Sequence, residues 1–327
     1  MGMTVLRFTR ADALRCRFGM SPVWETMSAV RVLHGHQHRP LYAPWVAART
    51  ETAARLDLSL LRAVQPRTGF TPDFLTPPPT ASRARFGTEI ARVRSTPLEL
   101  VRAELVRSRD ESNNPAAAEI DRMLTDVAGA RERLADQLET AWTALIEPDW
   151  PLISRVLDDD IAHRGRQLTT GGLAQLFDDL HPTLSWEGDR LIASRYREPD
   201  RELAGEGLLL VPGAFAWPHL VAVVAPTYQP TLVYPARGAA RLWSDVPPPP
   251  DPLAKLLGRT RATLLAALDP PATTSALAAQ YGLALATVAE HLAALYGAGL
   301  VTRRRTGHQV HYWRTDVGQA VLDASVG

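Results

Sequence analysis

The stretch Pro271–Arg314, PATTSALAAQYGLALATVAEHLAALYGAGLVTRRRTGHQVHYWR, decides the fold of the C-terminal part of the chain. Thr273 or Thr274 can cap the N-terminus of a first helix with its hydroxyl, and Gly282, which tolerates a positive φ, can end that helix. A second helix begins three residues later. Its apolar residues are spaced four and three apart, as one buried helix face requires: Val288, Leu292 and Leu295. The spacing predicts two helices joined by a tight turn.

Two short runs of alternating residues follow the second helix, Leu300–Arg305 and Gln309–Arg314. They flank a turn that contains Gly307, and alternation on both sides of such a turn predicts a β-hairpin. Two helices followed by a basic hairpin are typical of a winged helix-turn-helix, whose second helix fits the major groove of double-stranded DNA. Some winged helices bind proteins instead. Here the hairpin carries three consecutive arginines, which favour DNA as the partner: Arg303, Arg304 and Arg305.

The segment 253–320 resembles the winged-helix domain of the ArsR family of bacterial transcription regulators. The residues that carry the resemblance are Arg261, Leu277, Ala278, Thr287, Val288, His291, Leu292, Leu295, Gly299, Leu300 and Val301, with the aromatic end of the hairpin. The resemblance implies a sequence-specific regulator that acts as a homodimer. A repressor is expected, and an activator is the open alternative. The whole chain is similar to longer ArsR-type regulators, whose large N-terminal domain has no well-defined function.

This chain departs from the family pattern at several positions. The helix before the recognition helix reads SALAAQYG and lacks the Cys-x-Cys pair of many metal sensors in the family. Ala284 and Ala289 stand where serine is frequent, and Glu290 stands where a basic residue is common. A glutamate can accept a hydrogen bond from cytosine N4 but repels phosphate. We therefore expect affinity to depend strongly on the hairpin.

The expected DNA contacts follow from the two helices, the hairpin and the resemblance. The second helix should place three side chains at or near base edges: Thr287, Glu290 and His291. The arginines 303–305, with His308 at the turn, should meet phosphates or the minor groove. Arg261 should touch the backbone, and Thr274 at the start of the first helix is a further candidate contact.

Composition and charge divide the chain into two parts. The 327 residues suffice for one large or two modest domains. From Leu253 onward there are seven Lys or Arg against four Asp or Glu, while the rest has 29 against 31. A basic C-terminal module on a slightly acidic body fits a DNA-binding domain attached to a second domain. The proline run Pro247–Pro250 is the clearest boundary between them.

The expected fold class is mostly α (α+β). We expect an N-terminal domain over 1–246 that is helical over 1–180 and contains a small sheet over 181–246, a proline-rich linker over 247–252, and the winged helix-turn-helix over 253–327. Ser21 and Pro22 are typical of a helix start. Long helices are predicted over 88–109, with a kink near Pro97, and over 116–147, and a hairpin is predicted around Gly188.

The N-terminal domain is too large to serve only for dimerisation. Seven of the eight tryptophans lie in it, which suggests an aromatic pocket for a small-molecule effector. The candidate pocket residues are Trp24, Trp45, Phe74, Trp142 and Trp217. The alternative is that these rings belong to the core.

Other functional classes have less support in the sequence. Histidines 34, 36 and 38 could converge on a metal, but a solvated loop is the stronger reading, so no metal or cofactor is expected. The single cysteine, Cys16, allows no internal disulfide. No enzyme motif, signal peptide or apolar run near the ~20 residues of a membrane span is present, so a cytoplasmic, non-enzymatic protein is expected. The alternatives are an enzyme or small-molecule-binding protein whose winged helix contacts protein, or a metal-responsive regulator.

Overall fold

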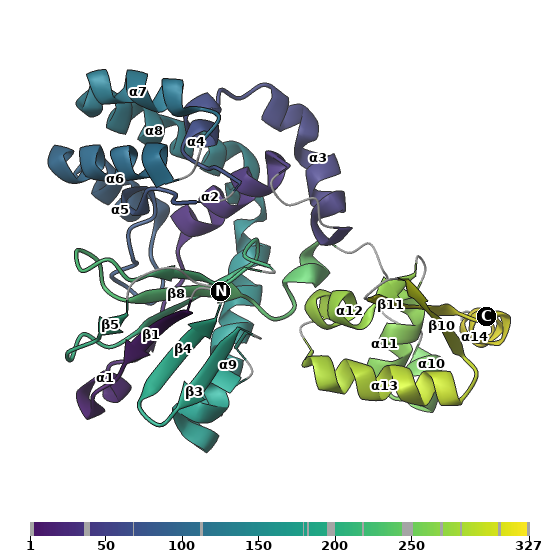
Figure 1. Cartoon of the computed structure of the whole chain (residues 1–327). Coiled ribbons are helices and arrows are strands. Elements are labelled where there is room, and N and C mark those ends of the chain that lie inside the picture. The colour runs from purple at the N-terminus through teal and green to yellow at the C-terminus, as the bar shows by residue number, and fades with distance from the viewer. Residues whose placement is uncertain are drawn as a thin grey trace. The chain divides into compact units, whose positions relative to one another are not determined.

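The chain forms two compact units, Met1–Ala236 and Arg237–Gly327 (Figure 1). This computed structural model describes residues 3–35, 40–67, 69–111, 114–178, 180–181, 183–194, 200–217, 219–243, 251–268, 271–281, 283–306 and 309–325. The division lies ahead of the proline run at 247–250, which is outside the described residues. Both units contain helices and small sheets, which confirms the expected fold class.

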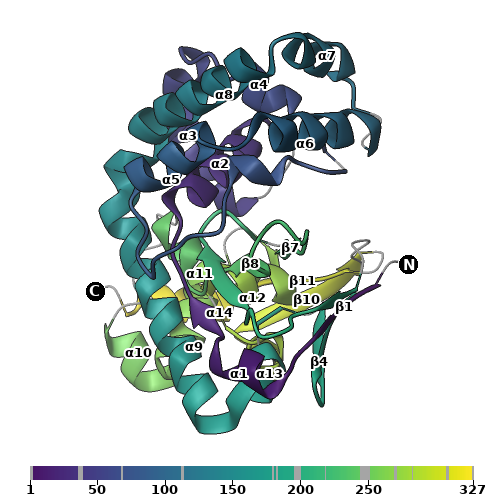
Figure 2. The same ribbon diagram turned by 90° about the vertical axis from the view of Figure 1, so that its left-hand side faces the viewer.

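The first unit contains nine α-helices among its described residues. They are α1 (Arg10–Leu14), α2 (Pro22–Leu33), α3 (Ala43–Ala54), α4 (Ser59–Ala63), α5 (Phe86–Arg94), α6 (Leu98–Glu111), α7 (Ala117–Thr125), α8 (Val127–Ala141) and α9 (Trp150–Asp178). Helices α2 to α8 gather on one side of this unit, and α9 runs from them along the sheets (Figures 1 and 2). A π-helical turn, Trp142–Ile146, follows α8.

The strands of the first unit form two four-stranded sheets, ordered β3-β4-β1-β5 and β2-β6-β8-β7. The strands are β1 (Met3–Arg7), β2 (Arg17–Phe18), β3 (Leu184–Glu187), β4 (Arg190–Ser194), β5 (Arg201–Glu202), β6 (Leu209–Gly213), β7 (Val221–Val223) and β8 (Thr231–Pro235). β1 pairs antiparallel with β4, and β2 pairs parallel with β6. The sheets therefore also contain strands from the N-terminal end of the chain, and are not confined to 181–246. The predicted hairpin is present as β3 and β4, with Gly188 at φ 67°.

Two long helices predicted from the sequence are each divided in the structure. The helix predicted over 88–109 is two helices, because Pro97 lacks the N–H that would continue α5 and instead precedes the first turn of α6. The prediction of a single helix over 116–147 was also wrong, because α7 and α8 are separated at Asp126. Asp126 adopts φ −141° and ψ 78°, and its carboxylate caps α8 by accepting from Gly129 N at 2.9 Å.

The second unit is a winged helix-turn-helix. Its elements are α10 (Asp251–Leu257), α11 (Arg259–Ala267), β9 (Ala272–Thr273), α12 (Thr274–Tyr281), α13 (Leu285–Gly297), β10 (Val301–Thr306), β11 (Gln309–Arg314) and α14 (Asp316–Asp323). The sheet order is β10-β11-β9. Thr273, one of the two predicted caps, accepts from Ala276 N at 3.1 Å. The predicted apolar face of α13 is fully buried: Val288, Leu292 and Leu295.

Glycine 299 ends α13 and directs the chain into the hairpin. Its φ is 70°, a conformation that glycine adopts without steric cost. Leu300 N donates to Leu295 O and Gly299 N donates to Tyr296 O, both at 3.0 Å, which is the Schellman pattern at a helix C-terminus. The register of the hairpin then pairs Arg303 with Tyr312.

No helix among the described residues has both the length and the apolarity needed to cross a membrane.

Two buried carboxyl groups connect α2 to the rest of the first unit. Glu25 accepts from Ala214 N at 2.7 Å and from Phe215 N at 3.3 Å, which joins α2 to the segment after β6. Glu89 of α5 accepts from Ser21 Oγ at 2.9 Å and Val23 N at 3.0 Å. Burial raises the pKa of both groups to about 7, and these hydrogen bonds oppose the rise.

These pKa values predict that stability falls as pH increases. In the unfolded chain each carboxyl loses its proton near pH 4.5, whereas in the folded chain it keeps it up to about pH 7. The unfolded state therefore binds fewer protons in this window, and each carboxyl lowers the free energy of unfolding by up to about 1.4 kcal/mol per pH unit. Glu89→Gln should remove up to about 1.4 kcal/mol per pH unit from the slope between pH 4.5 and 7. The slope is measured by urea denaturation followed by tryptophan fluorescence.

The matched control is Glu99→Gln, since Glu99 lies exposed on α6. It should leave the slope of the wild type unchanged. A Glu89→Gln protein with the full wild-type slope would show that Glu89 does not hold its proton in the folded state.

Candidate nucleic-acid interface

The outward face of α13 is poor in charge. Opposite its buried side, α13 exposes a stripe of residues at helical spacing: Ala286, Ala289, Glu290 and Ala293. Glu290 is the single charged residue of α13, and it makes no hydrogen bond or ion pair with any residue that the structure describes. The helix therefore presents methyl groups and one carboxylate.

The positive charge of this interface lies on the hairpin. Arg303, Arg304 and Arg305 are all exposed on β10. Because side chains alternate along a strand, Arg303 and Arg305 share one face and Arg304 lies on the other, opposite His311 in the register. Arg304 has no hydrogen-bond or ion-pair partner within the described part of the chain. Its guanidinium is thus available to an anion outside the protein.

The end of α13 holds one of these arginines. The Arg303 guanidinium lies 4.7 Å from the centre of the Tyr296 ring, and a hydrogen bond with Tyr312 raises its pKa. Tyr296 is 45% exposed and connects the recognition helix to the hairpin. The sequence prediction missed Tyr296; its only signal was an aromatic residue in the last turn before the Gly299 turn.

The remaining predicted contact residues have different surroundings. Thr274, Thr287, His291 and Arg261 are half-buried. Among the described residues, neither His291 Nδ1 nor Arg261 Nε has a hydrogen-bond partner, although both atoms are buried. The predicted contact at His308 lies outside the described residues. Thr287 and His291 flank the exposed stripe of α13, whereas Arg261 belongs to α11.

The N-terminus of α13 has no side-chain cap. Ala284 occupies the cap position with φ −60° and ψ 142°, the extended conformation of a capping residue, but it offers no acceptor to the first turn. The first N–H groups of an α-helix have no partner within the helix, and they carry a partial positive charge. This end of α13 can therefore receive a phosphate oxygen.

The five aromatic residues predicted to form an effector pocket pack in several parts of the first unit. Trp24 packs with strand residues such as Leu209. Trp45 lies edge-on to Phe215 with ring centres 4.6 Å apart, and Trp142 stacks on Phe86 at 4.8 Å. Phe74 is fully buried and Trp217 is half-buried.

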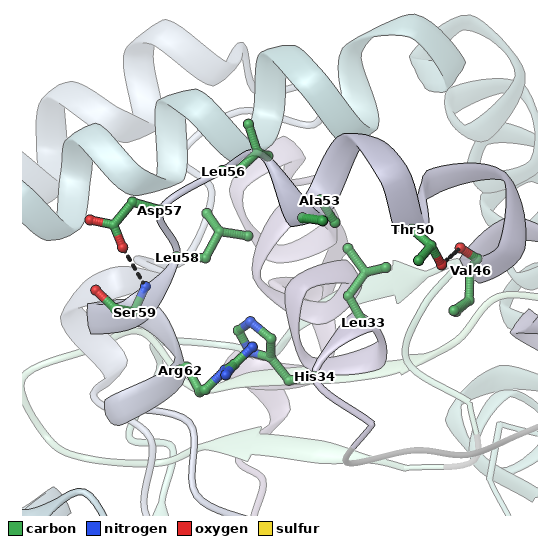
Figure 3. A pocket seen from close by; sticks show the side chains of 11 residues that line it. Leu33, His34, Val46, Thr50, Ala53, Leu56, Asp57, Leu58, Ser59 and Arg62 are labelled. Carbon is green, nitrogen blue, oxygen red and sulfur yellow. Dashed lines mark hydrogen bonds between the residues drawn. The ribbon is translucent and has the colours of Figure 1, made fainter.

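A cavity of about 330 Å³ lies elsewhere in the first unit, between the end of α2, α3 and α4 (Figure 3). Its lining residues are Leu33, His34, Val46, Thr50, Ala53, Ala54, Leu56, Asp57, Leu58, Ser59 and Arg62. None of the five predicted aromatic residues is among them. Asp57 accepts from Ser59 N at 3.0 Å, and the exposed Arg62 forms no ion pair with any described residue.

The described parts of the chain include the single cysteine and one of the three candidate metal-binding histidines. No cluster of three or more His, Cys, Asp or Glu side chains suited to a metal ion occurs among those residues. His36 and His38 of the histidine triplet lie outside them, and His34 lines the cavity. Burial raises the pKa of Cys16 to about 11, so its thiol stays protonated and weakly reactive near neutral pH.

Comparison with known families agrees with this architecture. Residues 79–240 match the model of a family of unknown function, DUF5937, and residues 256–304 match the model of a helix-turn-helix domain. A comparison with curated proteins found no match, and neither did a comparison with solved structures. The chain thus has the organisation of the longer ArsR-like regulators, as its sequence predicted, and the helix-turn-helix domain identifies it as a DNA-binding regulator.

The uncapped end of α13 predicts a stabilising substitution. Ala284→Ser places a hydroxyl where it can accept from the amides of Ala286 or Thr287, and a capping serine stabilises a helix by about 0.5–2 kcal/mol relative to alanine. Both amides should exchange with deuterium more slowly in the free protein. Ala289→Ser, in the middle of the same helix, is the control and should not slow them. Unchanged exchange in Ala284→Ser would contradict the assigned cap position.

Proposed function

We propose that this regulator is a repressor, that it binds double-stranded DNA as a homodimer, and that a small molecule bound to the first unit changes its DNA affinity. The observation that carries the DNA-binding part is the pairing of an exposed recognition helix, α13, with a hairpin whose arginines face outward. The homodimer follows the resemblance to ArsR-type regulators. Two-fold dimers of this kind bind half-sites about 34 Å apart.

The hairpin supplies most of the attraction to DNA. Four of the seven basic residues after position 252 lie in it, Arg303, Arg304, Arg305 and Arg314, while α13 contains none. Arg314 donates to Ala266 O at 3.0 Å and is therefore engaged inside the second unit. Arg303, Arg304 and Arg305 are exposed and are the proposed phosphate contacts, and phosphate contacts make binding sensitive to salt.

The cavity between the end of α2, α3 and α4 is the proposed effector site. At about 330 Å³ it lies at the lower end of the range for small-molecule sites, and leucine, valine and alanine side chains form much of its wall. Thr50, Asp57, Ser59 and Arg62 add polar groups to its lining. Arg62 forms no ion pair with any described residue, so it can pair with a small organic acid that has an apolar body. A ligand shifts DNA affinity if it binds one conformation of the protein better than another.

The DNA-binding role is tested by the salt dependence of binding. Fluorescence anisotropy with the full chain and the DNA upstream of its own gene should show selective binding that weakens steeply as salt rises. Arg304→Ala should lower the slope of the logarithm of the binding constant against the logarithm of salt concentration by about one unit, and replacing all three arginines should lower it by about three units. Each phosphate contact that is lost reduces the number of counterions released on binding.

The matched control is Arg55→Ala, an exposed arginine of the first unit that pairs with Glu51. Its slope should equal that of the wild type. An unchanged slope in the triple variant would exclude the hairpin as the phosphate-binding element.

The effector role is tested by filling the cavity. Ala53→Phe places a ring between the cavity walls, so it should abolish the response to any ligand that binds there. DNA binding is measured with and without a panel of small aromatic and aliphatic acids. An effector should change wild-type affinity about 5- to 150-fold, whereas Ala53→Phe should keep its ligand-free affinity and lose the change. A response that persists in Ala53→Phe would place the effector site elsewhere.

A further inference from the structure

We propose that α13 reads pyrimidines in the major groove: thymines through their 5-methyl groups, and a cytosine between them through its 4-amino group. The inference rests on the proposed DNA-binding function and extends it to the class of sequence recognised. It follows from which side chains α13 exposes and which it lacks.

The helix lacks the side chains that read purines through two hydrogen bonds. Guanine is usually recognised by arginine or lysine, and adenine by asparagine or glutamine, each through two hydrogen bonds. Residues 285–297, LATVAEHLAALYG, contain none of these four residue types. Direct recognition by α13 must therefore use apolar contact and the few polar groups that remain.

Three alanines form a methyl stripe along the outward face. Ala286, Ala289 and Ala293 are exposed and lie three and four residues apart, so they project from one side of α13. Seven residues of helix cover about 10 Å, which corresponds to roughly three base pairs at about 3.4 Å each. Alanine in the major groove makes apolar contact with the thymine methyl group. The stripe is thus long enough to contact consecutive thymines.

Glu290 sits within this stripe and accepts hydrogen bonds only. It is exposed and has no partner among the described residues, so its carboxylate faces the same groove as the alanines. Guanine N7 and O6 and thymine O4 are acceptors and repel a carboxylate, and adenine has its N7 acceptor beside its N6 donor. Cytosine N4 donates with no acceptor beside it, so cytosine is the preferred partner. Because the carboxylate is also repelled by phosphates, only a base that donates to it offsets this cost.

The test is selection of bound sites from random duplex DNA with the full chain, followed by anisotropy on the selected site. Pyrimidine-rich half-sites on one strand, with a cytosine flanked by thymines, are expected. Uracil differs from thymine only by lacking the 5-methyl group. Each contacted thymine that is replaced by uracil should weaken binding roughly fourfold, as expected for one buried methyl group.

A single substitution tests the cytosine contact. Glu290→Gln should exchange the preference for cytosine for adenine at that one position, because glutamine pairs with adenine N6 and N7. Arg304→Ala is the control and should weaken all probes by the same factor without changing base preference. Selected sites rich in guanine, or equal affinity for uracil and thymine probes, would overturn the pyrimidine proposal while leaving DNA binding intact. Absence of salt-sensitive binding to any DNA would overturn the proposed function as well.

Discussion

The burial of Val288, Leu292 and Leu295 fixes the rotation of α13 about its own axis, and the composition of the proposed DNA-facing surface follows from it. All three side chains are at most 1% exposed, in a core that includes Leu277 and Tyr312. Because residues three and four apart share a helix face, the face opposite them is occupied by the stripe from Ala286 to Ala293. Rotation of α13 to present other residues would expose its apolar face at a cost of about 1.5–3 kcal/mol for each large side chain.

The turn at Gly299 carries this constraint into the hairpin. Since Leu300 N is bonded to Leu295 O, the start of β10 is tied to the last turn of α13. Because side chains alternate along β10, the Arg303 guanidinium lies over the Tyr296 ring, while Arg304 lies on the opposite face of the strand. Two arginines that are adjacent in sequence therefore have different surroundings, one held by an aromatic ring and one without a partner among the described residues.

The sequence predicted what depends on local spacing. The apolar positions of α13 and the threonine cap before α12 were predicted, since each acts within a few residues. Pairing of β1 with β4 joins residues such as Thr4 and Ala193, and no local pattern specifies such a partner. Asp126 lies within the predicted helix 116–147, and its polar side chain fits an exposed helix position, so the sequence did not predict its non-helical backbone.

The distribution of charge in the second unit separates affinity from specificity. In the proposed mode of binding, attraction to phosphates comes from the hairpin and is nearly independent of DNA sequence, whereas α13 contributes a carboxylate that opposes it. If Glu290 made no contact with a base, its removal would increase the affinity for DNA of any sequence. The carboxylate is useful where it penalises the wrong base more than the right one, which is discrimination by repulsion. The arginines of the hairpin would then offset the unfavourable charge of Glu290, and Glu290 would contribute selectivity between bases.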